Sequence, residues 1–216
     1  SLGPSSPSLL EKKEPAALLA RVEGQLDRHD LIAARASSAL LEGARAELSP
    51  ELGARARLLA ARLVDLELDF SSAEQALQSL AQDPRAPSSL RYRAALRLAQ
   101  VVDPLADAQR ALRCYQLARS LAPRRAEAPT RAGLLLLYSG ETQQSGDLLR
   151  AALGLERSPE ALTNSATYLW SVARELPADD RRRAFAMRDS LRLIEEAIAA
   201  DPGAAEAHSI KDWVLR

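Results

Sequence analysis

The sequence predicts an all-α fold built from stacked antiparallel helical hairpins. Three observations support this prediction. Alanine, leucine and arginine, all strong helix formers, dominate the 216 residues. Apolar residues recur with helical spacing, and no segment alternates apolar and polar residues for long enough to form a strand. Short turns rich in proline, glycine, serine and aspartate divide this pattern into lengths that are typical of helices.

The pattern defines eleven helical segments from Pro15 onward. Ser-Pro at 49–50 and 158–159 marks two helix starts, because proline blocks the preceding helix and suits the first turn of the next one. The Ser/Pro/Gly-rich start predicts a flexible linker over residues 1–14, followed by one helical repeat domain over 15–216. The expected helices are 15–27, 30–47, 50–68, 71–82, 88–102, 105–121, 126–138, 142–155, 159–175, 179–200 and 204–215.

Three segments, 77–84, 115–123 and 194–202, end alike, which indicates an internal repeat. Their pattern resembles the tetratricopeptide repeat (TPR), a helix–turn–helix unit of about 34 residues. In that family, small residues let the two helices approach and a bulky residue fills the gap between them. The resemblance covers about 54–216 and implies a right-handed superhelix, an α-solenoid. The residues that carry it best are Ala111, Tyr115, Ala118 and Pro123 in one unit and Gly133, Ser145, Leu149 and Ala152 in the next.

One departure from the repeat lies between Ser171 and Ser190, where the chain is about twelve residues longer than the family unit. Asp179 or Asp180 is suited to cap a helix that runs on to about residue 200. The sequence therefore predicts an elongated hairpin that protrudes over residues 172–189. Its expected role is either to add packing or to dock a partner.

The composition argues against several functions. Lysine and arginine number 29, as do aspartate and glutamate, so there is no basic footprint for nucleic acid. No apolar run is long enough for an integral membrane span. The single cysteine, Cys114, and two distant histidines, His29 and His208, form no metal or catalytic pattern. We interpret His29 as a solvated turn residue and His208 as a packing residue, and expect neither enzymatic activity nor a cofactor.

The resemblance implies a surface that binds another protein, as a peptide or a helix, in a concave groove lined by the first helix of each hairpin. Asn164 could donate to and accept from the backbone of a ligand, and Tyr138 and Trp170 offer rigid aromatic area. The expected partner-binding residues are Glu127, Thr130, Arg131, Leu134, Tyr138, Thr163, Asn164, Thr167, Trp170 and Ser171.

We therefore interpret the chain as a non-catalytic scaffold or adaptor. The Ser/Pro start fits a tether that remains after a signal or lipobox segment is removed, which predicts a periplasmic or cell-envelope adaptor of a bacterium with a lipid anchor upstream of residue 1. The alternative is a cytoplasmic location, with residue 1 inside a longer protein.

Two other functions stay open. Residues 159–208 are similar to the accessory lipoproteins of TRAP-type transporters, which implies handling of a small ligand. The chain could instead be a regulatory domain of a larger protein. Terminal repeats expose apolar faces, so a homodimer through the C-terminal helix around Trp213 is a further expectation.

Overall fold

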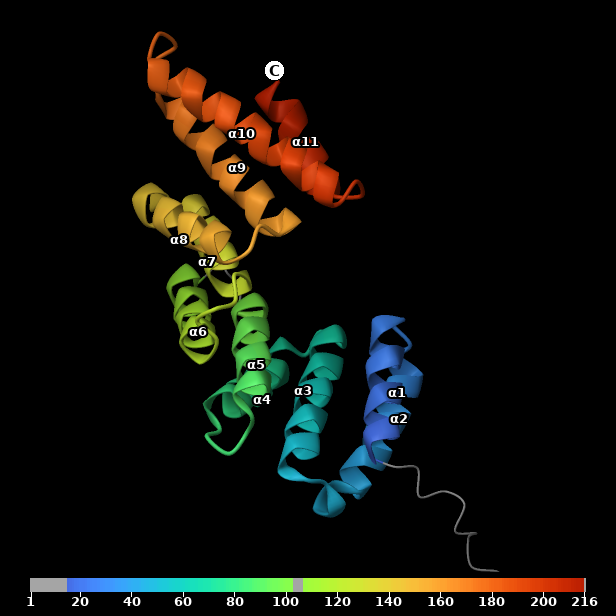
Figure 1. Ribbon diagram of the computed structural model, residues 1–216. Helices are drawn as coiled ribbons and strands as arrows, with labels where there is room; N and C mark the ends of the chain where they lie inside the picture. Colours follow the sequence, from blue (N-terminus) through green and yellow to red (C-terminus); the bar gives the residue numbers. More distant parts are fainter. Residues whose placement is uncertain (1–14, 103–106, 216) are drawn as a thin grey trace, which may run out of the picture. The chain divides into compact units, whose positions relative to one another are not determined.

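The computed structural model describes residues 15–102 and 107–215, and these ranges contain eleven α-helices and a short 3-10 helix, Arg45–Glu47 (Figure 1). The predicted all-α repeat fold is confirmed, and the expected 1–14 linker lies outside the described residues. The helices begin and end within a few residues of the predicted positions. They are α1 (Pro15–Asp27), α2 (Leu31–Gly43), α3 (Pro50–Leu66), α4 (Phe70–Gln82), α5 (Ser88–Val101), α6 (Ala108–Leu121), α7 (Glu127–Tyr138), α8 (Thr142–Leu155), α9 (Pro159–Glu175), α10 (Arg181–Ala200) and α11 (Ala205–Val214).

The helices form two compact units that divide between Val102 and Asp103. In the first unit, α3 packs on α1, α2, α4 and α5; in the second, α7 packs on α6, α8 and α9, and α9 packs on α10 and α11. We call the odd-numbered helices A-helices and the even-numbered helices B-helices. Within each unit, neighbouring A-helices contact one another and the B-helices pack against them. This is the stacking of antiparallel hairpins that the repeat predicts.

Small residues set how closely these helices approach. A Cβ atom on Gly133 of α7 would lie 2.7 Å from Cγ of Leu149 on α8, closer than real side chains come. Along α8, Ser145, Leu149 and Ala152 are all buried, as the small–bulky–small pattern predicts. The same is true of Ala111, Tyr115 and Ala118 on α6 and of Ser190, Ile194 and Ala197 on α10. The repeat positions inferred from the sequence are therefore confirmed.

Three of the turns between an A-helix and its B-helix share one conformation. His29, Leu68 and Gly140 have positive φ angles of 56°, 65° and 82°. After each, the next N–H donates to the carbonyl five residues before it, with distances of 2.9 to 3.1 Å, which is the Schellman pattern of a helix C-terminus. Only one of the three residues is glycine, so the turn keeps its geometry while its residue type varies.

Side-chain caps begin many of the helices. Oδ1 atoms of Asp30, Asp69 and Asp107 accept from backbone N–H groups at the start of α2, α4 and α6, at 3.2, 3.2 and 2.9 Å. Ser49 and Ser158 do the same for the A-helices α3 and α9, each followed by proline. The hydrogen bonds that Asp69 accepts from Ser72 lower the pKa of its carboxyl group. The capping residues explain why the predicted helix starts were nearly correct.

The elongated hairpin is confirmed by α9 and α10, which have 17 and 20 residues against 12 and 14 in α7 and α8. The α9–α10 turn lies at the end of this hairpin that points away from α8 (Figure 1). Asp180 caps α10, as expected, and its carboxylate also pairs with the Arg182 guanidinium at 2.6 Å. Beyond this cap, the Phe185 side chain is exposed.

We predict that Gly133→Ala lowers the free energy of unfolding by about 1–3 kcal/mol, because the added methyl group overlaps Leu149 and forces the two helices apart. Gly154→Ala is the matched control: it lies on α8 with nothing within 4 Å of an added Cβ, and alanine favours a helix more than glycine does. Chemical denaturation followed by circular dichroism measures both. Equal stability changes in the two variants would contradict the close helix approach.

Candidate functional site

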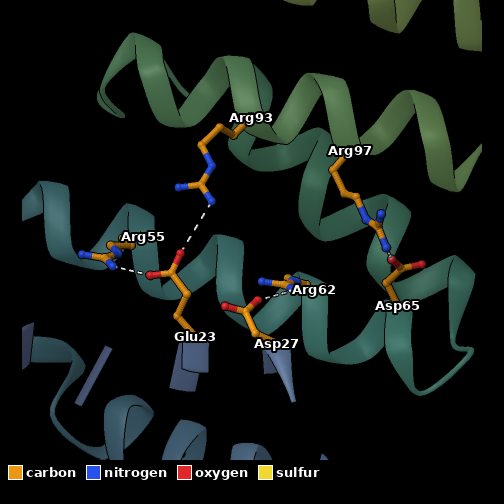
Figure 2. A network of polar contacts seen from close by, with 7 residues as sticks. All are labelled: Glu23, Asp27, Arg55, Arg62, Asp65, Arg93 and Arg97. Carbon is orange, nitrogen blue, oxygen red and sulfur yellow. Dashed lines mark hydrogen bonds and ion pairs between the residues drawn. The ribbon is translucent and has the colours of Figure 1, made fainter. Parts of the chain in front are cut away.

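The A-helices of the first unit carry a network of ion pairs, which we call the arginine ladder (Figure 2). The Arg62 guanidinium donates to Oδ1 of Asp27 at 2.8 Å, and an Arg93 nitrogen lies 3.7 Å from Oε1 of Glu23. Glu23 also accepts a hydrogen bond from Arg55, and Asp65 accepts one from Arg97. The ladder comprises Glu23 and Asp27 on α1, Arg55, Arg62 and Asp65 on α3, and Arg93 and Arg97 on α5.

The spacing of these pairs follows the repeat. Arg55 and Glu23 are 32 residues apart, as are Arg97 and Asp65. In the second unit, Arg131 pairs with a residue 29 positions away. Residues about one repeat apart occupy similar places on consecutive A-helices, so each of these pairs joins one A-helix to the next.

All four arginines of the ladder are at least a third exposed, whereas its acids range from the buried Asp65 to the exposed Asp27. The Asp65 side chain is only 7% exposed, whereas that of Arg93 is 50% exposed. The four guanidinium groups face three carboxylates, and each guanidinium has five N–H donors. Donors therefore remain for a further acceptor at this surface.

In the second unit, the A-helix face of α7 is also tied by ion pairs. Arg131 lies between Glu160 on α9, with Nε–Oε1 at 3.0 Å, and Glu127 on its own helix at 3.2 Å. Partial burial works to lower the pKa of Arg131, but attraction to the two carboxylates outweighs it and raises that pKa. One and two turns further along α7, Leu134 is half-buried and Tyr138 is 67% exposed. Arg131, Leu134 and Tyr138 are each at least partly accessible, and we call them the A-helix strip.

Four of the residues expected to contact a partner are instead buried: Thr130, Thr163, Asn164 and Thr167. The prediction that these four residues are accessible to a partner is wrong. Three of them lie on α9, which packs on α7, α8, α10 and α11 and has little surface free, whereas Thr130 lies on α7, which packs on α6, α8 and α9. The hydroxyl groups of Thr130 and Thr167 donate to carbonyl oxygens one turn earlier, at 2.8 and 2.9 Å. Oδ1 of Asn164 is buried without a hydrogen-bond partner.

The remaining two residues, Trp170 and Ser171, are half-buried. Trp170 stacks on Trp213 of α11 with 5.8 Å between ring centroids, and Cζ of Arg174 lies 4.8 Å from the Trp170 ring centroid. Trp170 therefore already has aromatic and cationic neighbours within the chain. Whether it and the other accessible residues bind a partner stays a prediction.

The groups considered for chemistry are placed as follows. His29 is exposed in its turn, as expected, whereas His208 is exposed and not a packing residue; its Nε2 lies 3.1 Å from the Pro202 carbonyl oxygen. Cys114 is partly buried.

Within residues 15–102 and 107–215, no three His, Cys, Asp or Glu side chains gather as metal ligands would. Of the helices described, none has the length and apolar character that a membrane crossing needs.

Sequence reasoning missed the arginine ladder, because each charge taken alone has the character of a solvated surface residue. The signal was nevertheless available. Acids and arginines recur about one repeat apart on successive A-helices, and the predicted helix bounds would have placed them side by side.

Of the comparisons with known proteins, the one with solved structures agrees with this architecture. No family model matches the sequence, and no curated protein matches it. Among solved structures, a thermophilic TPR protein of Thermus thermophilus matches with a TM-score of 0.63 and 18% identity, over 93% of this chain and 98% of that one. The chain has the TPR fold. A TPR protein from Parabacteroides merdae matches this TPR-fold chain with a TM-score of 0.63 and 15% identity, over 93% and 72% of the two chains.

A third TPR protein, YrrB, is described as having an unusual peptide-binding site. It matches with a TM-score of 0.54 and 16% identity, over 94% of each chain. At these identities the likeness establishes the fold and does not transfer a function.

The unequal burial of the ladder's acids leads to a prediction. Asp65→Asn should lower the free energy of unfolding by about 1–3 kcal/mol, because it leaves Arg97 beside a buried neutral group; the partial exposure of Arg97 limits the effect. Asp27→Asn, in the most exposed acid of the ladder, should cost less than about 1 kcal/mol. Thermal and urea denaturation compare the two variants. A larger cost for Asp27→Asn would contradict this ranking.

Proposed function

We propose that this TPR-fold chain is a non-catalytic scaffold that binds an acidic segment of a partner protein on the arginine ladder. The observation that carries the proposal is the set of four guanidinium groups on adjacent A-helices, each between a third and a half exposed. The fold supports it, since a TPR protein of similar structure is described as peptide-binding.

The chemistry of the ladder favours carboxylates. Guanidinium groups bind carboxylates through paired, charge-assisted hydrogen bonds, which also fix the direction of approach. Arg93 is the best placed, because Glu23 is shared with Arg55 and lies 3.7 Å from the Arg93 nitrogen. An incoming carboxylate could therefore bind Arg93 without first breaking a short ion pair.

The ladder is also held in place before a partner arrives. Glu23, Asp27 and Asp65 hold the arginines through ion pairs, so that a partner orders few side chains on binding. Preorganisation of this kind reduces the entropy cost of association. The ladder acids therefore position the arginines, and the arginines make the contact.

The test uses the full chain and two labelled peptides of equal length, one rich in glutamate and one rich in lysine, measured by fluorescence anisotropy. The glutamate-rich peptide should bind, and Arg93→Glu should weaken it about tenfold, because a repulsive charge replaces an attractive one. Arg21→Glu, at an exposed position of α1 outside the ladder, is the matched control and should bind like the wild type.

Equal weakening by both substitutions would show that only the general charge of the protein matters, and absence of glutamate-rich binding would overturn the proposal. Affinity capture from a lysate of the source organism then asks which protein is retained by the wild type and lost with Arg93→Glu. Asn164 and Trp170 are unsuited to this comparison, because substituting a buried or stacked side chain perturbs folding.

The cell-envelope location remains our proposal as well. It is supported only by the composition of residues 1–14, which lie outside the described part of the chain. Fractionation of the native cells is the measurement, and recovery of the protein only from the cytosol would defeat this location while leaving the ladder proposal intact.

A further inference from the structure

A groove of about 500 Å³ lies between the B-helices α6 and α8, on the second unit. Its floor is the side of α7 that carries Ala128, Pro129, Ala132 and Leu136, all buried. Small side chains leave room above them, and the ring of Tyr115 and the Leu112 side chain close the floor on the α6 side. The groove therefore offers an apolar base of the kind that receives apolar side chains.

The two walls of the groove have opposite charge. On α6, Arg113 and Arg119 line the groove and are exposed; within the described part of the chain neither has an ion-pair partner. On the α8 side, the lining residues include Glu141 and Asp147, also exposed. Asp147 pairs with Arg150 of its own helix, and Glu141 accepts from Gln144 at 3.1 Å.

The groove is distinct from the A-helix strip that sequence reasoning identified. Along α7, the floor residues Ala128, Ala132 and Leu136 are spaced at i, i+4 and i+8, and so share one side of the helix. Arg131 and Tyr138, seven residues apart, are rotated about 100–120° around the helix axis from that side, and neither lines the groove. A partner in the groove would not occupy the A-helix strip.

We infer that this groove binds an amphipathic helix of a partner protein, with acidic residues along one edge and basic residues along the other. The apolar ridge of the helix would lie on the α7 floor, with its acidic edge at Arg113 and Arg119 and its basic edge at Glu141 and Asp147. The α6 wall from Gln109 to Arg119 spans about 15 Å, which matches about three turns of helix. A helix suits this apolar floor because its own backbone hydrogen bonds are already made.

The test uses the full chain and three synthetic helical peptides that share one leucine ridge. Their edges are acidic and basic, both acidic, or both basic. In fluorescence anisotropy on Arg93→Glu, in which the ladder no longer favours acidic peptides, the peptide with one edge of each sign should bind about tenfold more tightly than the other two, because only it matches both walls. The wild type should bind that peptide with the same affinity, whereas the doubly acidic peptide should bind the wild type more tightly than Arg93→Glu if the ladder takes acidic segments, which separates this inference from the proposed function.

The double variant Arg113→Glu/Arg119→Glu makes both walls acidic. Its preference should move to the peptide with two basic edges, and this gain of binding also shows that the variant is folded. Arg124→Glu, an exposed position outside the groove, is the matched control and should keep the wild-type preference.

Three outcomes would overturn the inference. The first is equal or absent binding of all three peptides to Arg93→Glu, and the second is an unchanged preference in the double variant Arg113→Glu/Arg119→Glu. The third is self-association of the wild-type chain in sedimentation that the double variant abolishes, since the occupant would then be a second copy of this chain.

Discussion

The rest of the structure depends on how closely the two helices of a hairpin approach. Gly133 sits against Leu149 with no room for a Cβ atom, and Gly146 of α8 sits in the same way against Tyr168 of α9, the first helix of the next hairpin. These contacts fix the rotation of each helix about its axis. A fixed rotation determines which side of each A-helix faces its B-helix, which side faces the neighbouring A-helix, and which side faces the surface.

This constraint leaves each A-helix only a narrow strip for polar side chains. A polar group on the strip either pairs with the next A-helix, as Arg131 does with Glu160, or is enclosed between helices, as Asn164 is. Burial of a polar group without a partner is costly, whereas a half-exposed ion pair costs little. That difference accounts for the arginines and acids that recur where consecutive A-helices meet.

The parts of the fold that local chemistry decides could be predicted from the sequence. Ser158 and Pro159 mark a helix start by capping alone, and Gly133 with Leu149 reveals the repeat. The burial of Asn164 could not be predicted, because it depends on which helices pack against α9. The left-handed backbone conformation of Leu68 could not be predicted either, since leucine rarely adopts a positive φ angle and no glycine marks the position.

The helix α7 serves two surfaces at once, and Tyr115 is the residue that connects them. Its ring is buried at the groove floor, and burial raises the pKa of its phenol, while the nearby Arg131 guanidinium of the A-helix strip acts in the opposite direction. Substituting Tyr115 would therefore disturb the groove, the helix packing and the surroundings of Arg131 together. Exposed wall residues such as Arg113 touch only one surface, so differences among their variants can be assigned to that surface.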